Sequence, residues 1–539
     1  MRVKNVISIV LNCNLPFVRH PEVPFFYEEI PFYSSISDTI FPLLNMMEKL
    51  TADNVPFKIG LVISPTMCSM LQDELLISRY FAWLERQISF GVAEINRTKK
   101  NPKLFELAAY YHGKAVKNKS LFKDIYKSNI PAAFAAFQKK GMLELICAPA
   151  TNCFLPFYKD KKEAMNALFE TGIMSHNLSF HSSSNGIYLP LLGWHKALDQ
   201  YLIRCNINWS IIETHGALLA MPIAKYGSFY PIKTKNGTTL FVKDYYAYAD
   251  VMYKDNGIQY DPAFLDFYSD AVDNLPKEAV KLFLNSRGIR IPTGFKYTAM
   301  NKSLYNPQLA IERAVKMAEK FLCRRAEALA NAYDKLNDEE KKSNKKLLSL
   351  CVWDADFVGR FWHEGYVFLE NLFRLANQRD DVEFMTPSQY LEDQSDQDFQ
   401  IVEPEYSSTN INGYGETLIE ANNDWACRHI ARALDRMTEM SERFKDESGI
   451  RERCLNQAAR EVLLALSSDW PRLMSEVYTS SLPKWKSYAK KRLEEHLRNF
   501  TTIYESLGSN YLNTKFLTEL ENRNNIFPDM NYRVFQRNR

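Results

Sequence analysis

Short apolar runs alternate with long amphipathic stretches over about the first 400 residues of the chain. Runs of this kind, followed by polar residues or proline, are typical of buried parallel strands. They lie at residues 5–11, 57–63, 143–148, 209–213, 347–353 and 382–386. The clearest helix is predicted over Pro307–Leu336, where apolar residues recur every three or four positions. Repeated strand-then-helix units predict a parallel sheet or barrel.

One segment interrupts this alternation. Residues of about 66–135 contain helical patterns and no convincing strand, which predicts a helical insertion after the second strand. From about Asp424 onward the pattern is purely helical. Apolar helix faces are predicted over His429–Phe444, Leu455–Leu466 and Lys484–Leu507.

These patterns predict two domains. We expect an α/β barrel domain over residues 1–420, which includes the insertion, and a helical C-terminal domain over residues 421–539. A chain of 539 residues is too long for one hydrophobic core, so more than one unit is expected. The last stretch, 522–539, is polar and is predicted to lie loosely on the surface.

Composition excludes several classes of partner. The net charge of +3, from 67 basic and 64 acidic residues, is too balanced for a general nucleic-acid surface. No apolar run is long enough to predict a membrane span. The nine cysteines are scattered, odd in number and without a CxxC pair, which predicts reduced thiols in a cytoplasmic protein. Dispersed histidines and the lack of a glycine-rich phosphate loop predict neither a metal nor a cofactor.

Polar segments follow most of the predicted strands. In an α/β barrel the catalytic residues lie where strands end, at the carboxyl face. The segments that the sequence would bring to that face are 12–22, 149–156, 186–194, 214–216 and 354–365.

In their order and in their residues these segments resemble the motifs of glycoside hydrolase family 57, in its branching-enzyme-like branch. The first family motif reads H-A-H-L-P-[FY]-V-R-H-P-E, and here Asn12-Cys13-Asn14 precedes an unchanged Leu15–Glu22. The second reads L-E-L-x-x-x-x-A-T-H-G-F-L-P, and here Asn152 replaces the histidine.

The remaining motifs are also similar but altered. In the third, Gly186–Trp194, Leu191 stands where the family has glutamate. The fourth keeps Asp354 but has Arg360 for a histidine. The fifth, residues 407–413, has Thr409 where the family has tryptophan. Three further segments match, so the resemblance covers nearly the whole chain: 294–297, 423–429 and 463–471.

The resemblance implies an incomplete TIM-like (β/α)7 barrel with a helical insertion and an all-α C-terminal domain. It also implies a retaining mechanism, in which one carboxylate attacks the anomeric carbon and a second carboxyl group acts as acid and base. The acid/base position falls on Asp354 and the nucleophile position on Leu191. Leucine has no lone pair, so a covalent intermediate is not expected there. A 10⁵-fold loss of rate would correspond to about 7 kcal/mol of transition-state stabilisation.

Another carboxylate could replace the missing nucleophile. Glu213 ends a predicted strand beside His215 and is a candidate displaced nucleophile, or else a carboxylate that orients a neighbour. Asp356 lies two residues after Asp354, and its side chain is expected to point away if the strand continues.

The resemblance also implies sugar-binding positions. Asn12, Asn14 and Asn152 replace imidazoles of the sugar-binding floor, and an amide hydrogen-bonds but does not shuttle protons. His215 is a further candidate. Aromatic faces suit the apolar faces of pyranose rings, although core packing is an alternative role for each ring. The candidate stacking residues are Trp194, Trp353, Trp362, Trp470 and Tyr188. For Arg19 and His20 we expect a structural network.

Three hypotheses follow for function. The first is a catalytically impaired, family 57-like protein of α-glucan metabolism that still binds glucan or a partner enzyme. The second is an active 1,4-α-glucan branching enzyme or 4-α-glucanotransferase that uses Asp354 and a displaced nucleophile. The third is an interaction protein without a sugar site. An α-glucan is therefore the candidate partner, and the sequence leaves the oligomeric state open.

Overall fold

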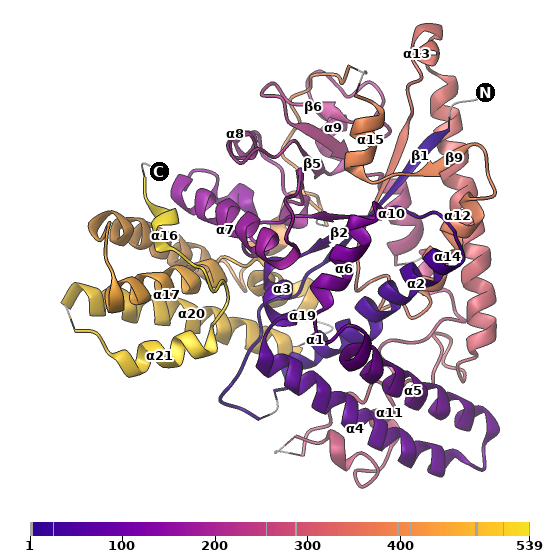
Figure 1. Ribbon diagram of the computed structural model, residues 1–539, viewed down its shortest axis with the longest axis horizontal. Coiled ribbons are helices and arrows are strands. Elements are labelled where there is room, and N and C mark those ends of the chain that lie inside the picture. Colours follow the sequence, from indigo (N-terminus) through magenta and orange to yellow (C-terminus); the bar gives the residue numbers. More distant parts are fainter. Residues whose placement is uncertain are drawn as a thin grey trace.

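The structure is a computed structural model that describes residues 4–24, 26–254, 256–285, 288–395, 398–409, 411–479, 483–509 and 511–537. Parallel strands occupy the centre of the molecule, and helices cover them (Figure 1). Within the described ranges, every helix is too short or too polar to span a lipid bilayer.

The first sheet is built around β1, whose nine residues are almost all buried. Its order is β3-β2-β1-β8 with every pair parallel, and β9 pairs with the start of β1. The strands are β1 (Asn5–Cys13), β2 (Ile59–Ile63), β3 (Leu143–Ile146), β8 (Leu348–Asp354) and β9 (Val382–Phe384). All five coincide with runs that the sequence predicted as strands.

The second sheet has the order β4-β5-β7-β6, in which β6 is antiparallel to β7. Its strands are β4 (Gly186–Ile187), β5 (Trp209–Ile212), β6 (Ile232–Lys233) and β7 (Thr239–Val242). Isolated parallel bridges, Cys147 with Ile187 and Lys243 with Leu350, join the two sheets. The parallel strands therefore surround a common core without continuous pairing, as expected for an incomplete TIM-like barrel.

Helices alone connect β2 and β3, which confirms the helical insertion. They are α3 (Pro65–Leu71), α4 (Glu74–Thr98), α5 (Pro102–Ser120) and α6 (Ile130–Lys139). Asp73 and Asn101 cap α4 and α5, because their side chains accept hydrogen bonds from Leu76 and Leu104 backbone N–H groups. In Figure 1, α4 and α5 project from the lower edge of the barrel.

Further helices pack around the strands. They are α1 (Ile30–Ser35), α2 (Phe41–Ala52), α7 (Lys162–Phe180), α8 (Asp199–Arg204), α9 (Thr214–Leu218), α10 (Tyr245–Met252), α11 (Ala271–Asn274), α12 (Pro307–Asp334), α13 (Asp338–Lys342), α14 (Gly365–Ala376) and α15 (Pro387–Asp393). Gly172 lets α7 approach the segment after β3, since a Cβ there would lie 2.3 Å from the Ala148 carbonyl oxygen.

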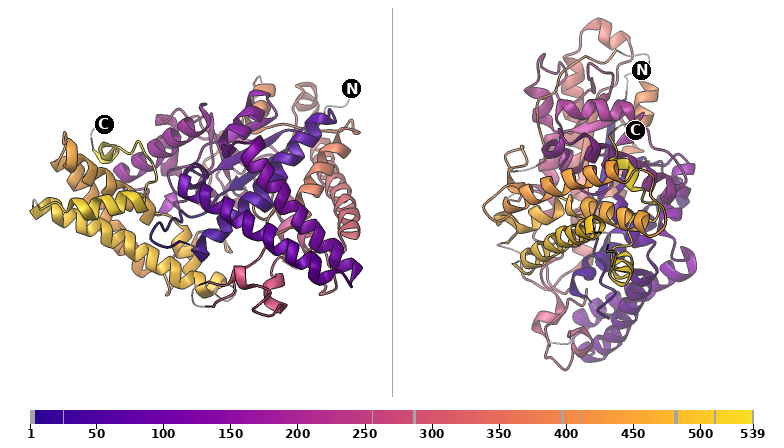
Figure 2. Two further views of the ribbon diagram at one scale, coloured as in Figure 1. Left: turned by 60° about the horizontal axis from the view of Figure 1, so that its bottom comes forward. Right: turned by 90° about the vertical axis from the view of Figure 1, so that its left-hand side faces the viewer.

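The C-terminal helices form a separate layer at one end of the molecule (Figure 2). They are α16 (Trp425–Arg443), α17 (Gly449–Ala465), α18 (Asp469–Met474), α19 (Glu476–Thr479), α20 (Pro483–Ser509) and α21 (Thr514–Arg523). The all-α character is as predicted, while the boundary at residue 420 stays a prediction.

The prediction of a loose C-terminal tail was wrong. Tyr532 and Phe535 have no exposed surface, and η10 (Tyr532–Phe535) packs against α7 and α16. The Tyr532 hydroxyl donates a hydrogen bond to the Phe444 carbonyl oxygen at 2.6 Å. A few large buried residues anchor this otherwise polar segment, because burial of apolar and aromatic surface stabilises it.

Candidate active site

The register between β1 and β8 brings two predicted site residues together. Asn12 lies directly opposite Asp354, and its Nδ2 donates a hydrogen bond to Asp354 Oδ1 at 3.0 Å. Both side chains are partly buried at the carboxyl ends of their strands. The amide of Asn12 therefore orients the carboxylate at the acid/base position.

Leu191, at the nucleophile position, has an unusual backbone conformation. It lies in the short helix η5 (Pro190–Leu192) with φ 55° and ψ 22°, and Leu192 also has a positive φ of 48°. This left-handed region costs a residue with a side chain about 1–2 kcal/mol. The Thr409 backbone N–H donates a hydrogen bond to the Leu191 carbonyl oxygen at 2.6 Å and holds the turn. The Leu191 side chain is partly exposed, so an aliphatic group occupies this point of the surface.

Glu213, the candidate displaced carboxylate, is already neutralised within the protein. Lys243 Nζ lies 2.8 Å from its Oε1, and the Thr409 hydroxyl donates a second hydrogen bond to the same oxygen. Burial alone would raise the pKa of Glu213. Lys243 and Thr409 lower it, and together these effects outweigh burial, so the pKa lies below its ordinary value. Lys243 also lies 3.8 Å above the ring of Tyr248. A carboxylate held in this way is a weak nucleophile.

Tyr188 lies near both carboxylates. Burial raises its pKa well above the ordinary value, and the charges of Asp354 and Glu213 raise it further. The phenol therefore stays protonated and can donate a hydrogen bond in this neighbourhood. The structure thus brings the acid/base position and Glu213 to one part of the carboxyl face.

The other two asparagines contact the C-terminal helices instead of each other. Asn152 Nδ2 donates to Asp469 Oδ1 at 2.7 Å, and Asn14 Nδ2 lies 3.3 Å from the same oxygen. Ser467 Oγ donates to Asp469 Oδ2 at 2.9 Å. Burial raises the pKa of Asp469, and these donors partly oppose that rise. The amides therefore tie α18 to the ends of β1 and β3.

His215 is positioned by the segment that follows residue 407. Its Nε2 lies 2.9 Å from the Gly413 carbonyl oxygen, and its ring packs edge-on against Tyr414 at 5.4 Å. It is partly exposed, so its role as a sugar contact stays a prediction. Asn410, in the same motif, lies outside the described residues.

The four tryptophans predicted as stacking platforms are core residues in this structure. Trp194, Trp353, Trp362 and Trp470 are each at most 1% exposed, so none presents a ring face to a cleft. Trp470 Nε1 donates to the Leu464 carbonyl oxygen at 2.8 Å. The sequence showed aromatic residues near strand ends but did not show which side they face, and packing turned them inward.

Asp356 and Arg360 form a structural pair beside the site. They are joined at 2.8 Å, and Ser35 and Thr39 hydroxyls each donate to Asp356 Oδ1 at 2.8 Å. The strand β8 ends at Asp354, so the condition of that prediction is not met, and the Asp356 side chain is directed toward the helices after β1.

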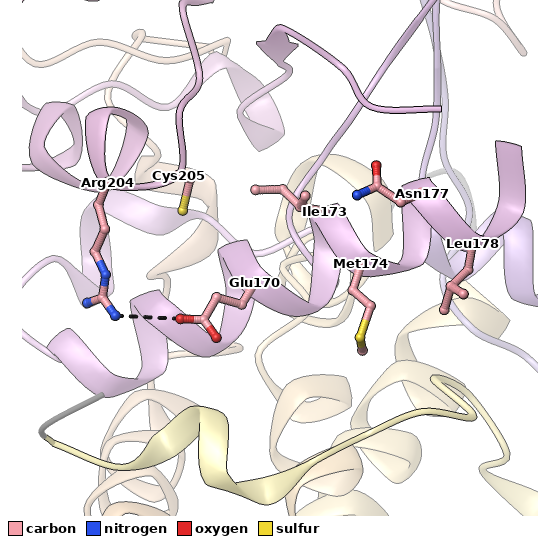
Figure 3. Close-up of a pocket in the computed structure, with 7 residues that line it drawn as sticks. All are labelled: Glu170, Ile173, Met174, Asn177, Leu178, Arg204 and Cys205. Atoms are coloured by element: carbon pink, nitrogen blue, oxygen red, sulfur yellow. Dashed lines mark ion pairs between the residues drawn. The ribbon is translucent and has the colours of Figure 1, made fainter. Parts of the chain in front are cut away.

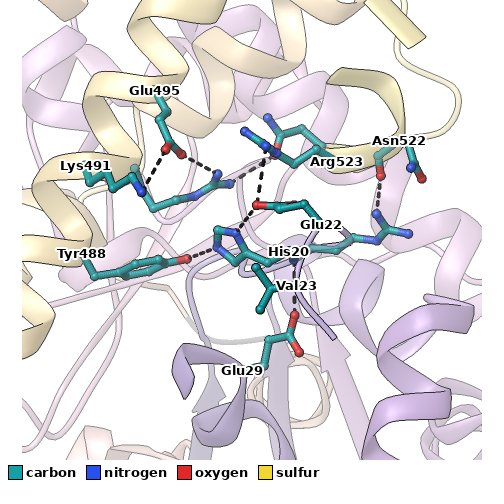
Figure 4. Close-up of polar contacts among 12 residues, drawn as sticks. His20, Glu22, Val23, Glu29, Tyr488, Lys491, Glu495, Asn522 and Arg523 are labelled. Carbon is teal, nitrogen blue, oxygen red and sulfur yellow. Dashed lines mark hydrogen bonds and ion pairs between the residues drawn. The ribbon is translucent and has the colours of Figure 1, made fainter. Parts of the chain in front are cut away.

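His20 joins the barrel to the C-terminal helices (Figure 4), and Arg19 does so by donating a hydrogen bond to the Asn522 carbonyl oxygen. His20 Nε2 lies 3.0 Å from the Tyr488 hydroxyl on α20, and its Nδ1 lies 3.0 Å from Glu22 Oε1. Arg19 Nε donates to Asp73 at 2.8 Å. Burial lowers the pKa of His20 to about 4, so the ring is neutral at pH 7. This is the structural network that the sequence predicted.

A cavity of about 470 Å³ lies elsewhere, between α7 and the end of α8 (Figure 3). Arg204 and Glu170 form an ion pair of 3.6 Å at its edge. Because α8 ends where the chain enters β5, this cavity is at the opposite side of the barrel from Asp354. Among the described residues, no group of three or more His, Cys, Asp or Glu side chains is arranged to hold a metal ion.

Sequence reasoning missed Lys243 and Asp469. Lys243 directly follows β7, which was not predicted as a strand. The run Thr239–Val242 is apolar and ends in Lys243 and Asp244, so the rule used for the other strands could have found it. Asp469 lies in the matched segment 463–471, but no local signal marks its amide partners, because Asn152 and Asn14 are more than 300 residues away.

Comparison with known proteins agrees with this geometry. Residues 8–404 match the model of glycosyl hydrolase family 57. The chain belongs to glycosyl hydrolase family 57. Residues 429–535 match the C-terminal region of 1,4-α-glucan branching enzymes, so the family resemblance extends over the helical layer.

Similar proteins cover nearly all of this family 57 chain. The 1,4-α-glucan branching enzyme TK1436 of Thermococcus kodakarensis is 26% identical, over 97% of this chain and 77% of that protein. The structure of the α-amylase AmyC from Thermotoga maritima has a TM-score of 0.90 at 29% identity, covering 99% of this chain and 100% of that one. A family 57 branching enzyme from Pyrococcus horikoshii shares the fold, with a TM-score of 0.85 at 24% identity over 99% of this chain and 97% of that one.

Proposed function

We propose that this family 57 protein acts in α-glucan metabolism, binds α-glucan at the carboxyl face of its barrel, and is impaired in the double-displacement reaction. The observation that carries the proposal is Leu191 at the nucleophile position. A side chain without a lone pair forms no bond to the anomeric carbon, whatever the geometry around it. The branching enzyme and the α-amylase to which the chain is similar support an α-glucan as the ligand.

Glu213 does not readily replace the missing group. A nucleophilic carboxylate needs a free electron pair, whereas Glu213 is bound to Lys243 at 2.8 Å and to the Thr409 hydroxyl. Breaking the pair would leave a buried charge without a partner, which costs about 3–5 kcal/mol. Asp354 is retained and hydrogen-bonded to Asn12, so it can still contact a sugar hydroxyl.

Two assays test the proposal. In native gels with and without glycogen, the wild-type protein should be retarded by glycogen. In a branching assay on amylose, the wild type should show no activity above that of Asp354→Asn, its matched control. Branching that Asp354→Asn abolishes would refute the impairment and favour an active branching enzyme or glucanotransferase.

A third measurement separates the remaining alternatives. Mass spectrometry after incubation with an activated glucosyl donor should find no glycosyl adduct on the wild-type chain. An adduct at Glu213 that Glu213→Gln removes would show that the nucleophile is displaced. Absence of both glycogen binding and branching would favour an interaction protein without a sugar site.

A further inference from the structure

Lys296 is a recessed cation that no carboxylate of the described chain pairs with. It lies in the segment before α12, where its side chain is only partly exposed. Its ammonium group donates to the Phe267 carbonyl oxygen and lies 3.8 Å from the centre of the Phe267 ring. These contacts hold the ammonium group in place without neutralising its charge.

A second cation lies on the same aromatic cluster, and its charge is matched. Arg360 lies 4.6 Å above the ring of Phe361, which contacts the Phe267 ring at 4.5 Å between centroids. Arg360 forms a 2.8 Å ion pair with Asp356. Of the two cations that flank these rings, Lys296 alone therefore has a charge to offer a ligand.

Charged groups of both signs surround Lys296. Burial lowers the pKa of Lys296 to about 8. The charges of Asp270 and Asp38 oppose this shift, and the weaker effects of Lys114 and Arg360 add to it. Lys114 is paired with Asp38 at 2.6 Å. An anion in contact with the ammonium group would offset the cost of burying its charge.

Asp270 is occupied by other donors. It accepts hydrogen bonds from the backbone N–H groups of Val272, Thr293 and Gly294 at 2.9, 3.0 and 2.9 Å. The carboxylate thus satisfies the turn at the start of α11 and forms no ion pair with Lys296. It therefore leaves the lysine available to an incoming anion.

The cluster adjoins the candidate active site. The Phe357 backbone N–H donates to the Asp354 carbonyl oxygen at 3.0 Å, and the Phe357 ring packs against Phe361 at 5.2 Å. Phe267, Phe361 and Lys296 are all partly exposed, so a ligand can reach them. Aromatic rings suit the apolar face of a pyranose, and a lysine ammonium group suits a phosphate.

We propose that Lys296, Phe267 and Phe361 form a subsite for a phosphate monoester carried by an α-glucan, beside Asp354. Lys296 binds the phosphate, and the two rings contact the sugar that bears it. The glucan part rests on the function proposed above, whereas the anion part rests on the lysine and its surroundings alone.

The test compares one glucan in two forms: phosphorylated, and dephosphorylated with a phosphatase. In affinity gels the wild type should bind the phosphorylated form roughly tenfold more tightly, the size expected for one charge-assisted contact. Lys296→Met should lose this preference and bind both forms as the wild type binds the dephosphorylated glucan. Lys296→Arg should keep it, because the charge remains.

Lys277→Met is the matched control, since Lys277 is an exposed lysine in the neighbouring segment. Its preference should equal that of the wild type. Thermal unfolding of each variant checks that the fold is intact. Equal binding of the two glucan forms by the wild type would overturn the subsite and leave the proposed function standing.

If the wild type binds neither glucan, the proposed function fails. Binding of small phosphate ligands then tests whether the subsite exists. Glucose 6-phosphate is then titrated by nuclear magnetic resonance, with inorganic phosphate as the comparison. Binding of glucose 6-phosphate that is tighter than that of phosphate and lost in Lys296→Met supports the subsite. No binding, or equal binding of the two ligands, overturns it.

Discussion

Two lysines near the carboxyl face lie at the same distance from an aromatic ring but differ in their charge partners. Lys243 is 3.8 Å above Tyr248 and pairs with Glu213 at 2.8 Å. Lys296 is 3.8 Å above Phe267 and forms no ion pair with a carboxylate of the described chain. The ring supports each ammonium group, but only the first lysine has a partner that balances its charge.

The difference shows how similar local contacts serve different purposes. The ion pair of Lys243 with Glu213 stabilises the barrel and leaves the Glu213 carboxylate unavailable as a nucleophile. Lys296 forms no ion pair with a carboxylate of the described chain, and burial of its charge works against stability in the absence of a ligand. Substitutions at the two lysines should therefore have effects of opposite sign.

The largest effect is expected from Lys243→Met. It leaves Glu213 charged, buried and without a partner, so the free energy of unfolding should fall by about 3–5 kcal/mol. Urea unfolding at pH 7 measures the loss. The double variant Lys243→Met/Glu213→Gln should regain more than half of it, and a loss as large as that of the single variant would contradict the pairing.

Removal of an amide donor from a buried carboxylate should lower the free energy of unfolding less than removal of its lysine partner. Asn152→Ala removes the 2.7 Å donor to Asp469 and should lower the free energy of unfolding by about 1–3 kcal/mol. Asn14→Ala serves as the control and should cost less, because its contact is longer, at 3.3 Å. An unfolding midpoint shifted more by Asn14→Ala would reverse the expected order.

Removing the second donor to Glu213 should have a smaller effect. Thr409→Val should cost about 1 kcal/mol at pH 7 and reduce the depression of the Glu213 pKa. A depressed carboxyl pKa adds stability that is present above about pH 4.3 and is lost as pH falls through the folded value. Urea unfolding between pH 3 and 7 should therefore show the two proteins converging at the acid end. A constant difference across the range would argue against the role of the hydroxyl.

The smallest effect, of opposite sign, is expected from Lys296→Met. At pH 7 the variant should be as stable as the wild type or more stable, by on the order of 1 kcal/mol after solvent screening. The folded pKa of about 8 lies below the ordinary lysine value, so the wild type should gain on the variant as pH rises from 8 to 10.5. Unfolding curves over that range measure the gain. A loss of 3 kcal/mol at pH 7 would show that Lys296 has a partner like that of Lys243.

Local patterns predicted the strong elements and missed the weak ones. The buried run in β1 and the capped, periodic helix α12 are visible in sequence, because their apolar spacing matches the period of the element. β4 has two residues, and β6 has two as well, which is too short for a periodic signal. The order of the motifs predicted most of the site residues, but it did not predict which side chains contact one another.

The sequence alone determined the order of the longer strands and helices and placed Asp354 and Glu213 at strand ends, since periodicity and adjacency are local properties. Only the tertiary structure decided that Glu213 is paired with Lys243, that Asn152 binds Asp469, and that the tryptophans face inward. Such pairings depend on which distant segments meet in a close-packed interior, and the geometry of that interior belongs to the whole chain.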